Sequence, residues 1–267
     1  ASRLMDIEKG QMLAANDALV GEALIRFEGP TPAIRASVRG AGMEVAAIKQ
    51  AWPFFLAPPV RQWVFDNIAG GRIADVSLRA DLPPGVFARF RLGAKMNPRD
   101  YELKVRFAGV RLRTFGELPV IEDARGVFAM RGMSAEATLE AGRARVASGR
   151  VVNLDSGSYR VPDFAVRPNR AEIRVSAAGP ARDLAEIAEA RPLTVLSRIG
   201  LSPARVTGSG DVDIVAEFPV KRGLKYEEVS WNAIVNLAGA GSQDKVFGRS
   251  VSRADILVEA TTDQVRV

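Results

Sequence analysis

Apolar and polar residues alternate along most of this chain, a pattern typical of strands that have one buried and one solvated face. The clearest apolar sets are Ile34, Ala36 and Val38; Leu103, Val105 and Phe107; Ile173 and Val175; and Val212, Ile214 and Phe218. One-sided strands of this kind predict an antiparallel sheet. Six short segments rich in Gly, Pro, Asn or Asp are expected to be turns: DLPPG, KMNPRD, NLDSGS, RPNR, VTGSGD and AGAGS.

Two stretches break the alternation and predict short helices. In the first, residues 44–52 form a helix halted by Pro53, and a second helix starts near Pro58 and stops at Gly70-Gly71, because proline suits a first helical turn and glycine an end. This second helix is expected to place Val60, Trp63, Val64 and Ile68 on one side.

The other helical stretch follows Gly179. Leu184, Ile187 and Ala188 form its apolar stripe, Asp183 lies near its start, where an acidic group suits the helix dipole, and Pro192 halts it.

The two helical stretches belong to an internal repeat. Residues 33–53 align without gaps on residues 172–192, and the order of strand, helix, proline, second helix and hairpin then recurs. Further along, GGRIADVSLRADLP corresponds to PARVTGSGDVDIVAEFP, and VIEDARGVF to SVSRADILV. We therefore expect residues 1–267 to form one repeat-built unit, with copy one at about 33–171 and an incomplete copy two at about 172–267. Because the second copy has Arg191 where the first has Trp52, Trp52 is not expected to be catalytic, and the segment from Trp52 to Ile73 is expected to pack on or cap a sheet.

Composition narrows the possible chemistry. The 267 residues are 47% hydrophobic and 25% charged, which indicates a folded chain, and they include neither cysteine nor histidine. That excludes thiolate metal sites, disulfides and any catalytic arrangement built on histidine. There is no apolar run of about 18 residues that could span a membrane, and no signal peptide is visible. Because the chain opens without Met and ends on the strand-like DQVRV, it is interpreted as a segment of a longer protein.

The charge balance is basic, with 37 Lys and Arg against 31 Asp and Glu. These cations alternate with apolar residues, as in FARFRLGAK, and do not gather in a patch with aromatics between them. The pattern favours the solvated face of a sheet over a nucleic-acid site, and it also suits attraction to anionic lipid.

Three groups of residues could carry chemistry, and each has a plainer explanation. Asp183, Glu186 and Glu189 could act as a pair of catalytic acids, but a solvated helix face is favoured. Asn153, Asp155 and Asp163 could hold calcium, but they lack the loop spacing, so a turn is favoured. Ser209 lies between glycines without a histidine partner. No catalytic, cofactor or metal residue is assigned, and the chain is not expected to be an enzyme.

What remains is an extended, mainly β structure: a curled antiparallel sheet made of repeats with short helical insertions, whose apolar face must be covered. A trough lined by apolar side chains would suit acyl chains, whose burial yields roughly 0.8 kcal/mol per CH₂. The residues expected to line it are Leu103, Val105, Phe107, Ile173, Val175, Val212, Ile214 and Phe218.

One segment resembles a known family. Trp52-Pro53, Ala57-Pro58, Arg61 with Trp63, and Gly70-Gly71 with Ile73 and Asp75 resemble motifs of the AsmA-like family of bacterial envelope proteins, in its YhdP-type branch, and residues 224–239 look like its later strand repeat. The resemblance implies a β-groove in the periplasm, an inner-membrane anchor outside this segment, and movement of phospholipids between the inner and outer membranes. It implies no catalytic residues.

Two other hypotheses stay open. A structural or scaffolding β-repeat protein that assists envelope or outer-membrane assembly would bury the same faces protein on protein. An enzyme acting on an anionic polymer would need a clustered acid pair, which the sequence does not show.

Overall fold

A single antiparallel sheet makes up most of the molecule. The computed structural model describes residues 3–14, 17–28, 31–52, 58–86, 89, 97–163, 166–191, 193–221, 223–246, 248–262 and 264–266. The strands are β1 (Arg3–Ala14), β2 (Asp17–Glu28), β3 (Thr31–Glu44), β4 (Ile68–Ala69), β5 (Arg72–Leu82), β6 (Tyr101–Leu112), β7 (Ile121–Arg131), β8 (Ser134–Arg145), β9 (Val151–Val161), β10 (Arg170–Pro180), β11 (Val206–Pro219), β12 (Ser230–Val246), β13 (Arg249–Thr261) and β14 (Val265–Arg266). The helices are α1 (Val45–Ala51), α2 (Pro58–Asn67), α4 (Ala181–Glu189) and α5 (Val195–Arg198), with 3₁₀ turns η1 (Pro203–Arg205) and η2 (Tyr226–Glu228).

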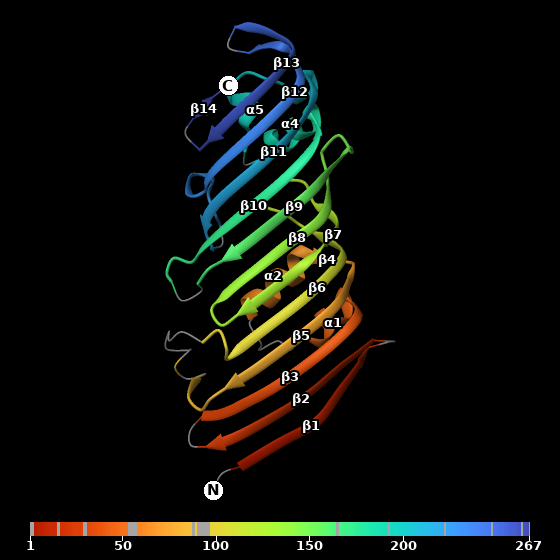
Figure 1. The fold of residues 1–267 in the computed structure, drawn as a ribbon, viewed down its shortest axis with the longest axis vertical. Coiled ribbons are helices and arrows are strands. Elements are labelled where there is room, and N and C mark those ends of the chain that lie inside the picture. The colour runs from red at the N-terminus through yellow and green to blue at the C-terminus, as the bar shows by residue number, and fades with distance from the viewer. Residues whose placement is uncertain are drawn as a thin grey trace.

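Strands follow one another across the sheet almost in chain order. The path runs β1-β2-β3-β5 and then through β14 in sequence, and only β4 leaves it, by pairing with β6. β1 forms one edge and β13 with β14 the other, so the sheet is open and does not close on itself (Figure 1). The predicted fold class, a mainly β, curled antiparallel sheet with short helical insertions, is confirmed.

The pairing register gathers the alternating apolar positions on one face. Val76 of β5 faces Val105 of β6, and Val105 faces Phe128 of β7. Directly opposed residues in an antiparallel pair point to the same side of the sheet. The same alignment passes through Ala137 and Tyr159 to Ile173 in β10, so apolar side chains form an unbroken face across successive strands.

Glycine-rich segments lie inside strands, where bulges interrupt the ladder. NLDSGS, VTGSGD and AGAGS were expected to be turns, and this was wrong, because they belong to β9, β11 and β12. Gly208 has φ of +103°, and a Cβ there would lie 2.7 Å from the carbonyl oxygen of Ala238. Only glycine allows this backbone approach at the β11–β12 bulge. The described residues of the other three turn segments, at 81–85, 97–100 and 167–170, do lie between strands or at strand ends.

The helices lie on the same side of the sheet, behind the strands in the view of Figure 1. The expected helix at 44–52 is α1, one residue shorter at each end. The second helix ends at Asn67, so Ile68 was wrongly placed in it and pairs instead with Leu112 as part of β4. Pro53 and Pro192, which were expected to halt the helices, lie outside the described residues.

The two proposed repeat copies have corresponding elements. In each, a strand leads directly into a helix, β3 into α1 and β10 into α4, and the strand after the helices pairs antiparallel with the strand before them. In both copies a hairpin follows, β6–β7 and β12–β13, and each hairpin has a glycine with positive φ, Gly109 and Gly239, at its bulge. A duplication of the sequence stays a prediction, with this correspondence as its support.

Candidate functional site

Three clusters of buried side chains seal parts of the apolar face. Under α4, Leu184 packs with Val152, Leu154 and Ala177. Under α1, Val45 packs with Ile73, Val110 and Ala124. The third cluster, at the other end of the strands, joins Val86 to Ala80 and Leu82. Helices α1 and α4 therefore cover one end of the strands, whereas the turn after β5 covers the other end only at β3, β5 and β6.

Between these clusters lies a band of half-buried apolar side chains, which we call the open strip. Its members share two properties: they are on the apolar face, and they belong to none of the three clusters. They are Leu78, Leu103, Phe128, Met130, Tyr159, Ile173, Ile214, Phe218 and Trp231. Every residue on this face between the bulges of β5 and β12 is uncharged.

All eight residues predicted to line the trough lie on this one face, because the register carries Phe107 through Gly126, Leu139 and Gly157 to Val175. They divide into two groups. Leu103, Ile173, Ile214 and Phe218 are in the open strip, whereas Val105, Phe107, Val175 and Val212 pack against the clusters under the helices. The lining set is thus half open and half sealed.

Sequence reasoning missed several members of the open strip. Tyr159 was hidden in the segment interpreted as a turn, and Phe128 and Met130 were overlooked although they alternate with Val127 and Ala129.

Two tyrosines bring phenol groups to the face. Burial raises the pKa of Tyr101 and of Tyr159, because the surrounding apolar side chains disfavour the phenolate. Both hydroxyls therefore stay neutral hydrogen-bonding groups at physiological pH.

The opposite, outer face is charged, and its charges are paired across strands. Arg131 binds Glu102 at 2.8 Å, and Arg106 binds Glu140 at 3.1 Å. Arg145 donates to Glu122 at 2.9 Å, and this hydrogen bond lowers the pKa of the Glu122 carboxyl. These partners are largely solvated, so each pair adds little stability. The pairing spreads the basic residues over the outer face together with acids, as the alternation predicts.

Asp183 and Glu186 are not on a solvated helix face, and that interpretation was wrong. The side chain of Asp183 is only 4% exposed and that of Glu186 14%, and both accept hydrogen bonds from Arg150. Burial raises the pKa of Glu186, but hydrogen bonds from Ser148 and the charge of Arg150 outweigh it, so the pKa lies below its ordinary value. This ion cluster ties α4 to the β8–β9 hairpin. The arginine lies between the acids, which suits anchoring and not acid–base catalysis. Glu189 instead accepts the Ser197 amide.

The other candidate ligands do not converge. Asn153 and Asp155 were expected in a turn, but both lie exposed on the outer side of β9, in a shallow depression that also holds Arg125 and Arg143. Asp163 follows the end of β9, and Ser209 is exposed within β11. In the described part of the chain, no cluster of acidic side chains could hold a metal ion.

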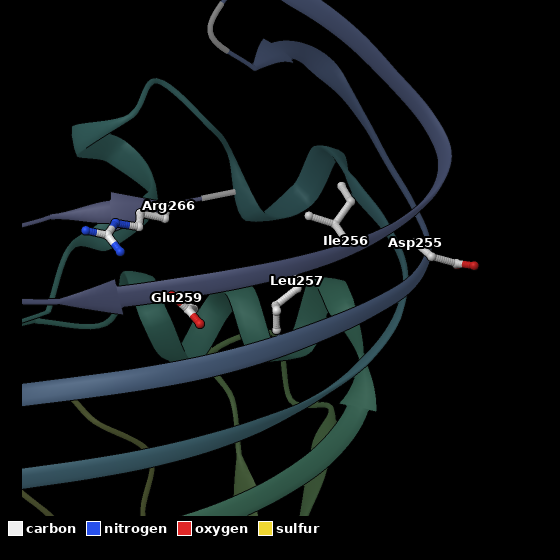
Figure 2. A pocket seen from close by; sticks show the side chains of 5 residues that line it. All are labelled: Asp255, Ile256, Leu257, Glu259 and Arg266. Carbon is white, nitrogen blue, oxygen red and sulfur yellow. The ribbon is translucent and has the colours of Figure 1, made fainter.

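A second depression lies at the sheet edge beside β13. It is lined by Asp255, Ile256, Leu257, Glu259 and Arg266. Figure 2 shows that these side chains point to both sides of the strand, so they do not surround a common point. The depression is a feature of the strand edge and lacks the convergent polar groups of a small-molecule site.

Comparison with known proteins gives no relative: no family model, no curated protein and no solved structure matches the chain. Among the helices of the described residues, none is long and apolar enough to cross a membrane.

Proposed function

We propose that this chain is a periplasmic, lipid-carrying segment of an AsmA-like envelope protein, anchored to the inner membrane outside this segment. In this role it moves phospholipids between the inner and outer membranes and catalyses no reaction. The observation that supports the proposal is the open strip: an uncharged, half-buried apolar band that continues from strand to strand and whose members belong to none of the three buried clusters.

The open strip is long enough to hold more than one acyl chain end to end. Its members lie on β5, β6, β7, β9, β10, β11 and β12, and Ala137 continues the apolar face on β8. At about 4.8 Å per strand these strands span roughly 34 Å. That is close to the ~30 Å hydrocarbon thickness of a bilayer, which the acyl chains of two opposed lipids fill. Each CH₂ group that leaves water for the strip gains roughly 0.8 kcal/mol, and no charged side chain interrupts the path.

Movement along the strip requires that no position hold the acyl chain too tightly. Contact with Leu, Ile, Phe and Met side chains is non-directional, so neighbouring positions offer similar binding energies. Tyr101, Tyr159 and Trp231 supply the few polar atoms on the face, and these could orient a lipid headgroup without a fixed charge. A headgroup would stay in water while the acyl chain moves from strand to strand.

The second candidate is a scaffolding role in envelope assembly. It is favoured by the two helix-covered clusters, which show that this chain buries part of the same face against its own segments. In that role a partner protein would cover the open strip permanently. The two candidates therefore differ in whether lipid contacts the strip.

A pair of matched substitutions separates these candidates. Ile214→Asp places a carboxylate in the open strip, and Ile234→Asp places the same group on the outer face, where Ile234 is 42% exposed. We expect both variants to stay folded, because both sites admit water, and only Ile214→Asp to lose binding of a fluorescent fatty-acyl probe. Val152→Asp, in the sealed cluster, should unfold at a cost of roughly 3 kcal/mol or more. If Ile214→Asp unfolds as Val152→Asp does, the strip is protein core and the lipid proposal is wrong.

A further inference from the structure

Two exposed aromatic side chains come from segments that are joined at the helix-covered end of the strands. Trp63 of α2 is 52% exposed, and Phe115, in the loop after β6, is 45% exposed. The Arg113 N–H donates to the Asn67 carbonyl at 2.7 Å, and β4, which follows α2 directly, pairs with the end of β6. The Asn67 side chain also donates to the Trp63 carbonyl at 2.8 Å. These contacts hold α2 beside the β6–β7 loop, so the two rings lie on neighbouring parts of the surface.

Trp63 is exposed although it lies on the apolar side of its helix. Successive helical residues are about 100° apart, so Trp63 and Val64 share one side of α2, where Val64 is half-buried. Phe65 lies on another side, with the Arg61 guanidinium 4.1 Å and the Lys49 ammonium 5.4 Å from the centre of its ring. Phe65 thus has partners within the chain, whereas Trp63 leaves about half of its surface in water. A large apolar side chain left exposed beside a second aromatic residue indicates contact with something outside the chain.

The charge that is left uncompensated around these rings is positive. Arg111 and Arg113, at the end of β6 and just after it, are both exposed, and neither forms an ion pair with another described residue. Glu117, in the same loop, lies 3.9 Å from Arg191, so its charge is balanced. Asp66 on α2 is the other acid, and its carboxylate accepts a hydrogen bond within the helix. Two unpaired cations are therefore set against one acid.

Aromatic rings beside unpaired arginines match the headgroup region of an anionic membrane. The indole of tryptophan has an apolar body and one polar N–H, and it is enriched where an apolar layer meets water. Arginine is attracted to a negatively charged lipid surface, and its apolar stem can lie along the lipid while the guanidinium reaches a phosphate. Anionic lipid therefore satisfies both the rings and the cations of this surface.

We propose that Trp63, Phe115, Arg111 and Arg113 form a membrane-contact surface that binds the headgroup region of an anionic phospholipid bilayer. The two rings enter the boundary between headgroups and acyl chains, and the guanidinium groups bind lipid phosphates. Because only two large apolar side chains insert, binding is reversible. This surface lies outside the open strip and does not depend on lipid transport.

Vesicles of defined composition test the surface. The probe is a vesicle of equal parts phosphatidylglycerol and phosphatidylcholine, and a vesicle of phosphatidylcholine alone is the neutral control. We expect the chain to bind the anionic vesicles at least tenfold more tightly in a co-sedimentation assay at low salt, and added salt should reduce the difference. Equal binding to both vesicles would overturn the proposal. Binding to neither would also overturn it, and is the result expected if these residues contact a protein.

A double variant tests the aromatic residues. Trp63→Ser with Phe115→Ser should weaken binding to the anionic vesicles at least tenfold while the chain stays folded, because both side chains are exposed. The matched control is Ile234→Ser, an apolar residue that is 42% exposed on the outer face, and it should bind as the unchanged chain does. Unchanged binding by the aromatic variant would overturn the proposal.

A second double variant tests the charges. Arg111→Gln with Arg113→Gln should also weaken binding to the anionic vesicles at least tenfold, because each cation near the lipid surface strengthens binding severalfold. The matched control is Arg39→Gln with Lys104→Gln, which removes two exposed cations of the outer face and should change binding no more than about twofold. Equal losses in the two variants would show that net charge, and not this surface, attracts the membrane.

Two readouts separate this surface from the open strip. The Trp63→Ser, Phe115→Ser variant should keep its binding of the fluorescent fatty-acyl probe, and Ile214→Asp should keep its binding of anionic vesicles. Loss of vesicle binding in a folded Ile214→Asp chain would mean that the open strip makes the membrane contact, which would overturn the proposal.

Discussion

Asp123 and Arg253 have the same left-handed backbone, with φ of 50° and 51°, although they lie in different strands. Each sits at the bulge of a hairpin, Asp123 before Ala124 in β7 and Arg253 before Ala254 in β13. In the sequence alignment of VIEDARGVF with SVSRADILV, Asp123 and Arg253 also fall at the same position. Positive φ is costly for residues with a side chain, so its occurrence at both positions indicates that the two bulges are equivalent features of the fold.

Replacing Arg253 by glycine should stabilise the chain. Glycine adopts positive φ without strain, and relief of that strain should exceed the entropy that glycine adds to the unfolded state, for a net gain of about 0.5–1 kcal/mol. Ser252→Gly is the matched control, because Ser252 is not among the residues with positive φ, and it should destabilise. Urea unfolding midpoints measure both. A loss of stability in Arg253→Gly would contradict the bulge interpretation.

Two adjacent glycines offer a second test of the curled backbone. Gly71 has φ of +74°, and a Cβ there would lie 2.6 Å from the backbone of Gly109, whereas Gly70 has φ of +60° with nothing within 4 Å of a Cβ. Gly70→Ala should cost about 1 kcal/mol of unfolding free energy from backbone strain alone. Gly71→Ala should cost clearly more, roughly 3 kcal/mol, because the backbone just before β5 must move away from Gly109 of β6. Equal costs would mean that this close approach does not exist.

Lowering the pH should weaken the attachment of α4 to the β8–β9 hairpin, because that attachment includes the carboxylate of Glu186. The pKa of Glu186 is lower in the folded chain than its unfolded value of about 4.3, so its contribution is present above that value and is lost as the pH falls through the lowered pKa. Glu186→Gln should therefore lower the urea midpoint at pH 7, and its effect should shrink as the pH is lowered into the acid range. Glu136→Gln, an exposed carboxylate on β8, serves as the control and should leave the midpoint nearly unchanged at neutral and acid pH. A pH-independent effect of Glu186→Gln would show that the ion cluster does not anchor the helix.

Much of this fold was predictable from the sequence, because alternation reports directly which side of a strand is apolar. All eight lining residues reached one face for that reason. The errors have two physical causes. Gly157, Gly208 and Gly239 suggest turns in a sequence, yet in a curled sheet they permit bulges and close packing within strands. The second cause is tertiary packing: whether Val105 or Leu103 is sealed depends on where α1 lies, which local pattern does not encode.

Asp183 shows that the burial of a charged side chain also cannot be predicted from local sequence. Its sequence position suits a helix dipole, and nothing local distinguishes it from a solvated acid. Arg150, 33 residues away, comes to Asp183 only because β8 and β9 form a hairpin beside α4. Pairing of this kind follows from the fold and could be identified only once the register was known.

Photo-crosslinking inside cells tests lipid contact with the open strip most directly. A photoreactive residue at Ile214 or Leu103 lies on the open strip, and one at the neighbouring position Asp213 or Lys104 lies on the exposed outer face. We expect phospholipid adducts at Ile214 and Leu103 and none at Asp213 or Lys104, detected by mass spectrometry of the purified chain. Adducts at all four positions, or at none of them while the chain remains folded, would contradict a lipid-carrying role.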